Sequence, residues 1–224
     1  MSEDRGALMA AEIAEQPTAL ARLLTPESIE LAQMLAATIR ERSPRFVLLA
    51  ARGTSDHAAL YAKYLVEVSL GLPAGLASPS TMTAYGARPD LSDVLLMTVS
   101  QSGGSPDLLE TVRTARAGGA TTLAVTNNVS SALAQEAELH LDVLAGPEHA
   151  VAATKSYSSQ LLALWQLIDA YRGGDGSAAV GIPEAAQSLI DRRADVAALA
   201  ARFRFTDRLV TTGRGYSYPT AREA

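Results

Sequence analysis

Residues 93–107 read DVLLMTVSQSGGSPD, and this stretch indicates both the fold class and the place where a ligand would bind. Its first half is an almost unbroken apolar run, which is typical of a parallel strand buried on both faces. A helix is expected from about Pro106, because proline suits a first helical turn. Between strand and helix lie two glycines and four short hydrogen-bonding side chains, those of Ser100, Gln101, Ser102 and Ser105. With the N–H groups and positive dipole end of the helix, they predict a phosphate-binding loop.

The same loop also has a purely structural interpretation. Serine is a common N-cap of helices and glycine a common turn residue, so both occur at strand–helix junctions that bind nothing. The loop taken alone does not separate the two interpretations.

The strand–turn–helix pattern recurs along the chain. Further strands are expected at 46–51, 72–76, 121–126 and 140–143. Apolar strands that alternate with helices predict an α/β fold, a doubly wound parallel sheet with helices on both faces. Ligands of such sheets bind beyond the carboxyl ends of the strands, and residues 53–55 fall at the same edge as the serine-rich loop.

The core of the fold is predicted over residues 43–172, preceded by an N-terminal helical extension over 1–42. Within that extension, a helix over 6–22 is broken at Gln16–Pro17. This helix is expected to be an arm more than a core element.

The C-terminal part is predicted to be a linker and helix over 173–206, with one long helix from 182 to 203. The residues that follow repeat the pattern of 46–55 and predict a further strand at 208–212. A single strand and half a helical turn cannot bury themselves. Residues 207–224 are therefore interpreted as the start of a second, truncated domain.

The composition excludes several classes of protein. The formal net charge is −5 and there is no basic run, which argues against a nucleic-acid partner. The absence of cysteine excludes disulfides and thiolate metal sites. Three histidines without an HExxH-like motif make a metal or other cofactor unexpected. No signal peptide and no apolar stretch of about 18 residues are present, so we expect a soluble cytoplasmic protein without membrane binding.

Five short motifs follow one another along the chain: EIAEQP at 12–17, RGTS at 52–55, SQSG at 100–103, GPE at 146–148 and VAATK at 151–155. In this order they resemble the sugar isomerase (SIS) domain family. The resemblance covers essentially the whole chain. It is strongest to the isomerase half of glucosamine-6-phosphate synthase and to SIS-type glucosamine-6-phosphate deaminases.

The resemblance implies a flavodoxin-like SIS domain, the first of two in tandem, that holds a phosphosugar. The residues that it assigns to substrate binding are Gly53, Thr54, Ser55, Ser100, Gln101, Ser102, Ser105 and Val151. Arg52 stands where the synthase tends to have cysteine, and Gly104 replaces a more usual glutamate. The family's catalytic lysine and glutamate are expected beyond Ala224. Glu148, the one carboxylate in residues 146–155, is then the only catalytic candidate in the chain.

These implications predict the phosphosugar-binding domain of an amino-sugar phosphate isomerase or deaminase, which would interconvert the aldose and ketose forms of a hexosamine 6-phosphate. The synthase is disfavoured, because this chain has neither its glutamine-hydrolysing domain nor any cysteine. The alternative is a regulatory module that senses a phosphosugar without catalysis, and whether the chain is an enzyme stays open. A homodimer is expected, because the apolar helix over 157–171, the arm and the strand at 208–212 would leave much apolar surface exposed.

Overall fold

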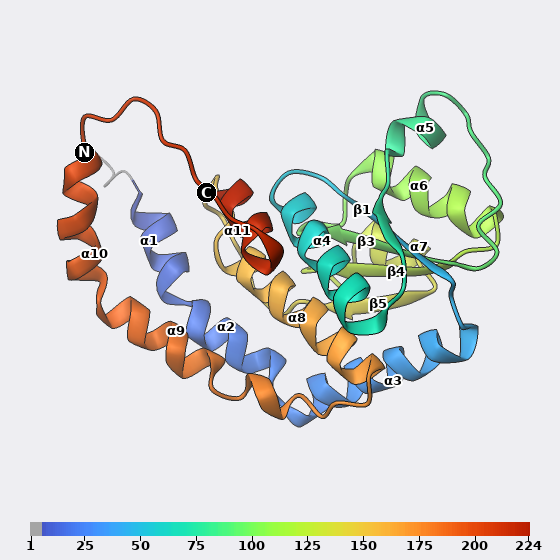
Figure 1. Cartoon of the computed structure of the whole chain (residues 1–224), viewed down its shortest axis with the longest axis horizontal. Helices are drawn as coiled ribbons and strands as arrows, with labels where there is room; N and C mark the ends of the chain where they lie inside the picture. Colours follow the sequence, from blue (N-terminus) through green and yellow to red (C-terminus); the bar gives the residue numbers. More distant parts are fainter. Residues whose placement is uncertain (1–5) are drawn as a thin grey trace.

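The structure, a computed structural model, describes residues 6–224 and contains a five-stranded sheet with helices on both sides (Figure 1). All neighbouring strands pair in parallel, in the order β2-β1-β3-β4-β5. The strands are β1 (Phe46–Ala51), β2 (Ala74–Leu76), β3 (Val94–Ser100), β4 (Thr121–Thr126) and β5 (Leu139–Asp142). This order, with one topological switch point between β1 and β3, confirms the predicted doubly wound α/β fold of flavodoxin-like type.

The register of the central strands places the ends of β1 and β3 side by side. Phe46 pairs with Val94 at one end of the ladder, and Ala51 pairs with Val99 at the other. Since both strands run in the same direction, the loops that follow them open at the same edge of the sheet. At a switch point these loops lead to helices on opposite faces, which leaves a crevice between them.

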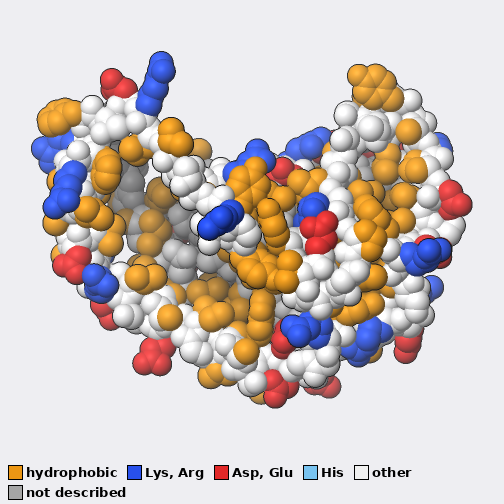
Figure 2. All heavy atoms as spheres, viewed as in Figure 1, with side chains coloured by type: hydrophobic (Ala, Val, Ile, Leu, Met, Phe, Trp, Pro, Cys, Tyr) orange, Lys and Arg blue, Asp and Glu red, His pale blue; other side chains and the backbone are white. Residues whose placement is uncertain are grey.

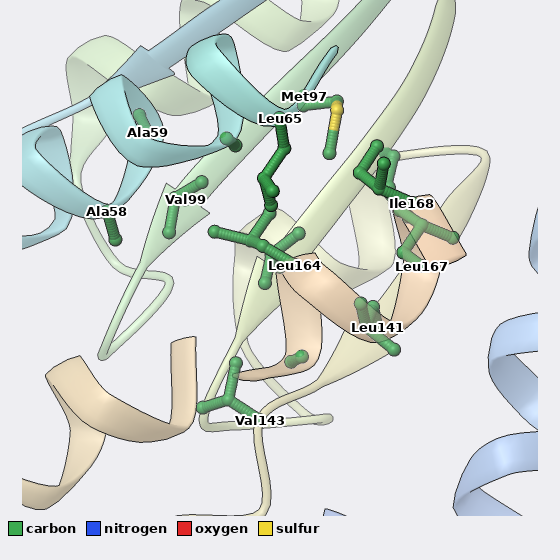
Figure 3. Close-up of a cluster of buried hydrophobic side chains, with 14 of the residues drawn as sticks. Ala58, Ala59, Leu65, Met97, Val99, Leu141, Val143, Leu164, Leu167 and Ile168 are labelled. Carbon is green, nitrogen blue, oxygen red and sulfur yellow. The ribbon is translucent and has the colours of Figure 1, made fainter. Parts of the chain in front are cut away.

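Helices cover both faces of the sheet. On one face lie α3 (Pro26–Arg42), α4 (Thr54–Leu65) with a π-helical extension η1 (Val66–Leu70), and α8 (Lys155–Tyr171); on the other lie α5 (Pro79–Thr83), α6 (Pro106–Ala117) and α7 (Ala132–Glu136). Met97 of β3 packs with Leu65 and Leu164 in the larger buried cluster (Figure 3), whereas its neighbour Leu96 packs with Leu108 in the smaller one. This alternation explains why β3 is almost entirely apolar, with Thr98 buried among its apolar residues.

The N-terminal helices are α1 (Ala7–Ala14) and α2 (Gln16–Leu23). The break between them falls where it was predicted, because Pro17 lies in the first turn of the second helix. The expectation of a loose arm is wrong for α2, which packs against α8 and buries Leu20 and Leu23. Its apolar residues recur at helical spacing, so α2 has a face to place on the core.

After α8 the chain forms η2 (Ser177–Ala179), α9 (Ile182–Asp191), α10 (Arg193–Ala200), η3 (Ala201–Phe203), η4 (Gly215–Ser217) and α11 (Tyr218–Glu223). The single helix predicted over 182–203 is wrong, because Arg192 leaves helical geometry at φ −89° and ψ 13° without any proline or glycine to signal it. The strand predicted at 208–212 is also wrong, and these residues have no regular secondary structure. A strand needs a neighbour to satisfy its backbone groups, and no strand of the sheet pairs with this segment. Within the described residues, none of the helices combines the length and the apolar character needed to cross a bilayer.

The C-terminal arm, defined as residues 182–203, exposes apolar side chains to solvent. Leu189, Val196 and Phe203 are 66%, 59% and 49% exposed, and hydrophobic side chains are visible on the left lobe in Figure 2. Figure 1 shows that α9 and α10 run beside α1 and α2, away from the sheet. Contiguous apolar surface of this kind is usually covered in solution.

We expect a second copy of the chain to cover this arm, because homo-oligomers are the commonest assemblies of soluble proteins. Light scattering at high micromolar concentration should give a dimer or a larger species. The double substitution Leu189→Glu and Val196→Glu should shift the mass toward the monomer, whereas Glu184→Gln on the same arm should not. A monomer from the unmodified chain at that concentration would contradict the expectation.

Candidate functional site

A polar cleft of about 210 Å³ lies at the crevice between β1 and β3. Three segments line it: the junction of β1 and α4, the loop between β3 and α6, and the start of α8. The lining residues are Arg52, Thr54, Ser55, Ser100, Gln101, Ser102, Ser105, Ala153, Ser156 and Gln160. Two of the expected binding residues lie elsewhere. Gly53 lines a neighbouring cleft, and Val151 is fully exposed, outside the wall that Ala153 and Ser156 form.

The hydroxyl of Ser105 does not cap the helix that it precedes. Ser105 is the N-cap of α6, with backbone angles φ −68° and ψ 117°, yet its side chain accepts no hydrogen bond from the first turn. Thr25 and Ser131, which hold the same position before α3 and α7, each accept such a bond, at 3.4 and 3.2 Å. The Ser105 hydroxyl is therefore available to a ligand at a helix N-terminus, where an anion is stabilised. This observation favours the phosphate-binding interpretation of the loop over the purely structural one.

Gly103 gives this loop its tight turn. Its φ is +64°, and a Cβ at this position would overlap the side chain of Ser131, so only glycine fits. The Gly103 N–H donates to Oγ of Ser100 at 3.1 Å, and the Gly104 N–H donates to Oγ of Ser102 at 3.3 Å. The loop is thus shaped by its own hydrogen bonds, as a preorganised binding site requires.

Buried polar side chains form the floor of the cleft. Ser55, Ser156 and Gln160 are at most 5% exposed. Nε2 of Gln160 donates to Oγ of Ser55 at 3.0 Å, while Oε1 of Gln160 has no protein partner among the described residues. An unpaired amide oxygen is unfavourable in a core, and native proteins keep few of them. The floor therefore offers a ligand the Ser55 hydroxyl, which Gln160 holds in place, and the unpaired Oε1 of Gln160.

Glu148 binds the N-terminus of α8 and is not among the residues that line the cleft. Its Oε1 accepts the N–H of Thr154 at 2.8 Å and that of Ser156 at 3.3 Å, and its Oε2 accepts the Ser156 hydroxyl. Burial raises the pKa of Glu148, but the hydrogen bonds from Ser156 and Thr154 outweigh it, and the net pKa lies below the usual glutamate value. A carboxylate with these bonds suits a helix cap better than a general base, whose pKa should lie near the working pH.

A family model described as SIS domain matches residues 42–170, more than half of the chain. The chain belongs to the SIS domain family. This confirms the resemblance that the ordered motifs carry, since four of the five motifs lie wholly within the matched residues. Residues of RGTS, SQSG and VAATK line the cleft.

Curated relatives of this SIS domain extend well beyond it in length. Glutamine–fructose-6-phosphate aminotransferase [isomerizing] from Symbiobacterium thermophilum is 37% identical, and the enzyme of the same name from Halobacterium salinarum is 32% identical. Each comparison covers 96% of this chain and 38% of the relative. The chain therefore spans well under half the length of these relatives.

Solved structures share the fold. A candidate phosphosugar isomerase from Silicibacter pomeroyi is 37% identical, with a TM-score of 0.89 over 96% of this chain and 66% of that one. The C-terminal domain of glucosamine-fructose-6-phosphate aminotransferase from Francisella tularensis has a TM-score of 0.77 over 99% of this chain and 67% of that one, at 23% identity. Glucosamine-6-phosphate deaminase from Thermotoga maritima has a TM-score of 0.65 over 97% of this chain and 65% of that one, at 22% identity.

The EIAEQP motif of the N-terminal helices binds the segment 146–155, which lies beside the cleft. Glu12 is 5% exposed and accepts the N–H groups of His149 and, at 3.2 Å, of Ala150. Glu15 forms an ion pair with Lys155, which is 2% exposed at the start of α8. Two carboxylates of the N-terminal extension thus position the GPE and VAATK segments.

A second cleft, of about 610 Å³, adjoins the first, because Arg52 lines both. His57 lines this second cleft, and its Nδ1 lies 2.6 Å from Oε2 of Glu223. The other oxygen of Glu223 accepts the hydroxyl of Thr54 at 2.8 Å. Glu223 belongs to α11, which packs on α4 (Figure 1), so the C-terminal segment of the chain reaches the edge of the binding cleft.

Sequence reasoning did not assign five residues of the SIS domain's site to binding. Arg52, Ala153, Ser156 and Gln160 line the cleft, and Glu223 bonds to Thr54 at its edge. The available signal for Ser156 and Gln160 was that these two polar residues stand four positions apart in the helix α8, and so on one helix face. Nothing local signalled Glu223. Among residues 6–224, no three histidine or acidic side chains lie close enough to form a metal site.

Proposed function

We propose that this SIS domain binds a hexose or hexosamine 6-phosphate in the 210 Å³ cleft, with the phosphate on the loop at 100–105. The observation that carries the proposal is the uncommitted hydroxyl of Ser105 at the N-terminus of α6. Ser102 and Gln101 lie on the same loop, and Thr54 and Ser55, from the start of α4, also line the cleft, where a sugar's hydroxyls would find partners. Polar groups in a small concave site at a switch point are typical of such ligands.

The relatives' names suggest the substrate class. Glutamine–fructose-6-phosphate aminotransferase and glucosamine-6-phosphate deaminase act on six-carbon sugars phosphorylated at position 6, as their names state. The proposed role of this chain is therefore the phosphosugar-binding part of an amino-sugar phosphate isomerase or deaminase. Because the chain spans 38% of its curated relatives, the activity of a whole enzyme is part of the proposal.

A sensing role without catalysis is the second candidate. No carboxylate or imidazole is among the described residues that line the cleft, and Glu148 caps a helix beside it. Aldose–ketose interconversion needs a general base within hydrogen-bond reach of C1 and C2. A coupled assay with glucosamine 6-phosphate and fructose 6-phosphate distinguishes the two roles, and for the 224-residue chain we expect no rate above buffer. Turnover by this chain would establish the enzymatic role and contradict that expectation.

Replacing Ser102 and Ser105 together by alanine should weaken the binding of glucosamine 6-phosphate at least tenfold, measured by calorimetry. The expected loss is about 1.4 kcal/mol or more, since each hydroxyl would make a charge-assisted hydrogen bond to the phosphate. Ser92→Ala is the matched control, because Ser92 is an exposed serine before the opposite end of β3. Unchanged affinity in the double variant would rule out the loop as the phosphate site.

A further inference from the structure

An ion pair spans the crevice at the topological switch point. Nε and Nη2 of Arg52 both lie 2.6 Å from Oδ2 of Asp107. Arg52 follows β1, whereas Asp107 stands in the first turn of α6, after β3. The pair therefore links the two loops that bound the cleft, and Arg52 lines both the 210 Å³ and the 610 Å³ cavities.

The charges of Arg52 and Asp107 would affect the binding of an anionic ligand in the cleft. Arg52 is the one charged residue among the described residues that line the smaller cleft. Asp107 lies two residues after Ser105, so an unpaired carboxylate there would repel a phosphate on the loop. The Arg52 guanidinium offsets that charge. A guanidinium has five N–H donors, and binding one carboxylate oxygen through two nitrogens leaves others for a ligand.

The ion pair between Arg52 and Asp107 contributes little to the stability of the fold. The side chains of Arg52 and Asp107 are 52% and 31% exposed, and exposed ion pairs contribute at most about 1 kcal/mol to folding. Removal of Arg52 should therefore leave the protein folded.

We propose that Arg52 is an anion-binding, specificity-determining residue of the cleft, and that Asp107 is a positioning residue that orients its guanidinium. This inference rests on the proposed binding of a sugar 6-phosphate. Arg52 selects phosphorylated over neutral sugars, because it supplies the cationic contact that the serine-rich loop lacks. The planar fork of arginine matches phosphate oxygens, which the ammonium of lysine does not.

The test measures glucosamine 6-phosphate binding by calorimetry over a range of salt concentrations. Arg52→Gln should weaken binding at least tenfold and make the salt dependence of the dissociation constant shallower, because one charge–charge contact is lost. Arg52→Lys should recover only part of the affinity. In the Arg52→Gln background the Asp107 carboxylate is unpaired and only repels the ligand, so Asp107→Asn should strengthen binding at least threefold there. When Arg52 is present, Asp107→Asn also removes the group that orients the guanidinium, so the gain in affinity should disappear or become a loss.

Arg113→Gln is the matched control, because Arg113 forms a comparable exposed ion pair with Glu136 from the same helix α6, at 2.9 Å. It should leave both the affinity and its salt dependence unchanged. The melting temperature of each variant without ligand reports any purely structural effect.

An Arg52→Gln affinity within twofold of the unmodified chain, with the same salt dependence, would overturn this inference. The proposed function would still stand if the Ser102→Ala and Ser105→Ala double variant lost binding in the same experiment. Absence of binding by the unmodified chain to both glucosamine 6-phosphate and glucose 6-phosphate would overturn both proposals together.

Discussion

The substitution Leu164→Ala is expected to lower the free energy of unfolding by about 3 to 4 kcal/mol. Leu164 is fully buried at the middle of α8, among Met97, Leu65 and Val99 (Figure 3). Truncating this side chain removes the favourable free energy of burying it. It also leaves a cavity that the close-packed interface between sheet and helix cannot fill by relaxation. Urea denaturation measures the change, and the slope of the transition should stay constant.

Leu189→Ala is the control for this prediction. Leu189 is 66% exposed on α9, so the same deletion removes little buried surface and should change stability by less than about 0.5 kcal/mol in the monomer. A loss below about 1.5 kcal/mol for Leu164→Ala would show that α8 can move inward, and that the packing in Figure 3 does not fix its position.

The substitution Glu148→Ala should cost about 2 to 3 kcal/mol of stability at neutral pH. It removes the acceptor of the N–H groups of Thr154 and Ser156, and nothing else in the first turn of α8 replaces it, since Thr154 makes no side-chain cap bond. Glu27→Ala is the control, because Glu27 is an exposed acidic residue in the first turn of α3. Thermal or urea unfolding of both variants gives the comparison.

The effect of Glu148→Ala should depend on pH in a defined direction. Burial raises the pKa of this carboxyl, but the hydrogen bonds from Ser156 and Thr154 bring it below its usual range in the folded protein. A lowered folded-state pKa stabilises the protein above the unfolded-state value, about 4.3, and this contribution is lost as the pH falls through the folded-state pKa. The stabilities of the unmodified and Glu148→Ala proteins should therefore converge as the pH falls through the lowered pKa of Glu148. A constant difference down to pH 2.5 would contradict the assignment of the cap.

The sheet and the serine-rich loop were predictable because their signals are local. A run such as 94–99, apolar except for Thr98, fits a strand with helices on both faces, and Pro106 marks the start of the next helix. The role of Ser105 could be stated only as one of two alternatives, since an N-cap serine has the same sequence signature whether or not it caps. The distance from its hydroxyl to the backbone of α6 decides this, and that distance is a tertiary property.

The rest of the site depends on contacts between distant residues. Gln160 meets Ser55 across 105 positions of sequence, and Glu223 meets Thr54 across 169, so no window of the sequence contains either pair. The strand predicted at 208–212 failed for the related reason that β-pairing needs a neighbour that the local pattern cannot supply. The sequence showed Glu12 only as part of a motif. Its hydrogen bonds to the N–H groups of residues 149 and 150, which explain the carboxylate, are visible only in the structure.

The positions of Glu12 and Glu15 have a practical bearing on how the protein is trimmed for crystallography or screening. A fragment cut to the matched span, 42–170, would keep every strand of the sheet and every residue that lines the smaller cleft. It would nevertheless discard both carboxylates that tether the 146–155 segment, along with the apolar side of α2, and would remove the ion-pair partner of Lys155. We therefore expect the smallest autonomous folding unit to include Glu12, about thirty residues before the start of the matched span.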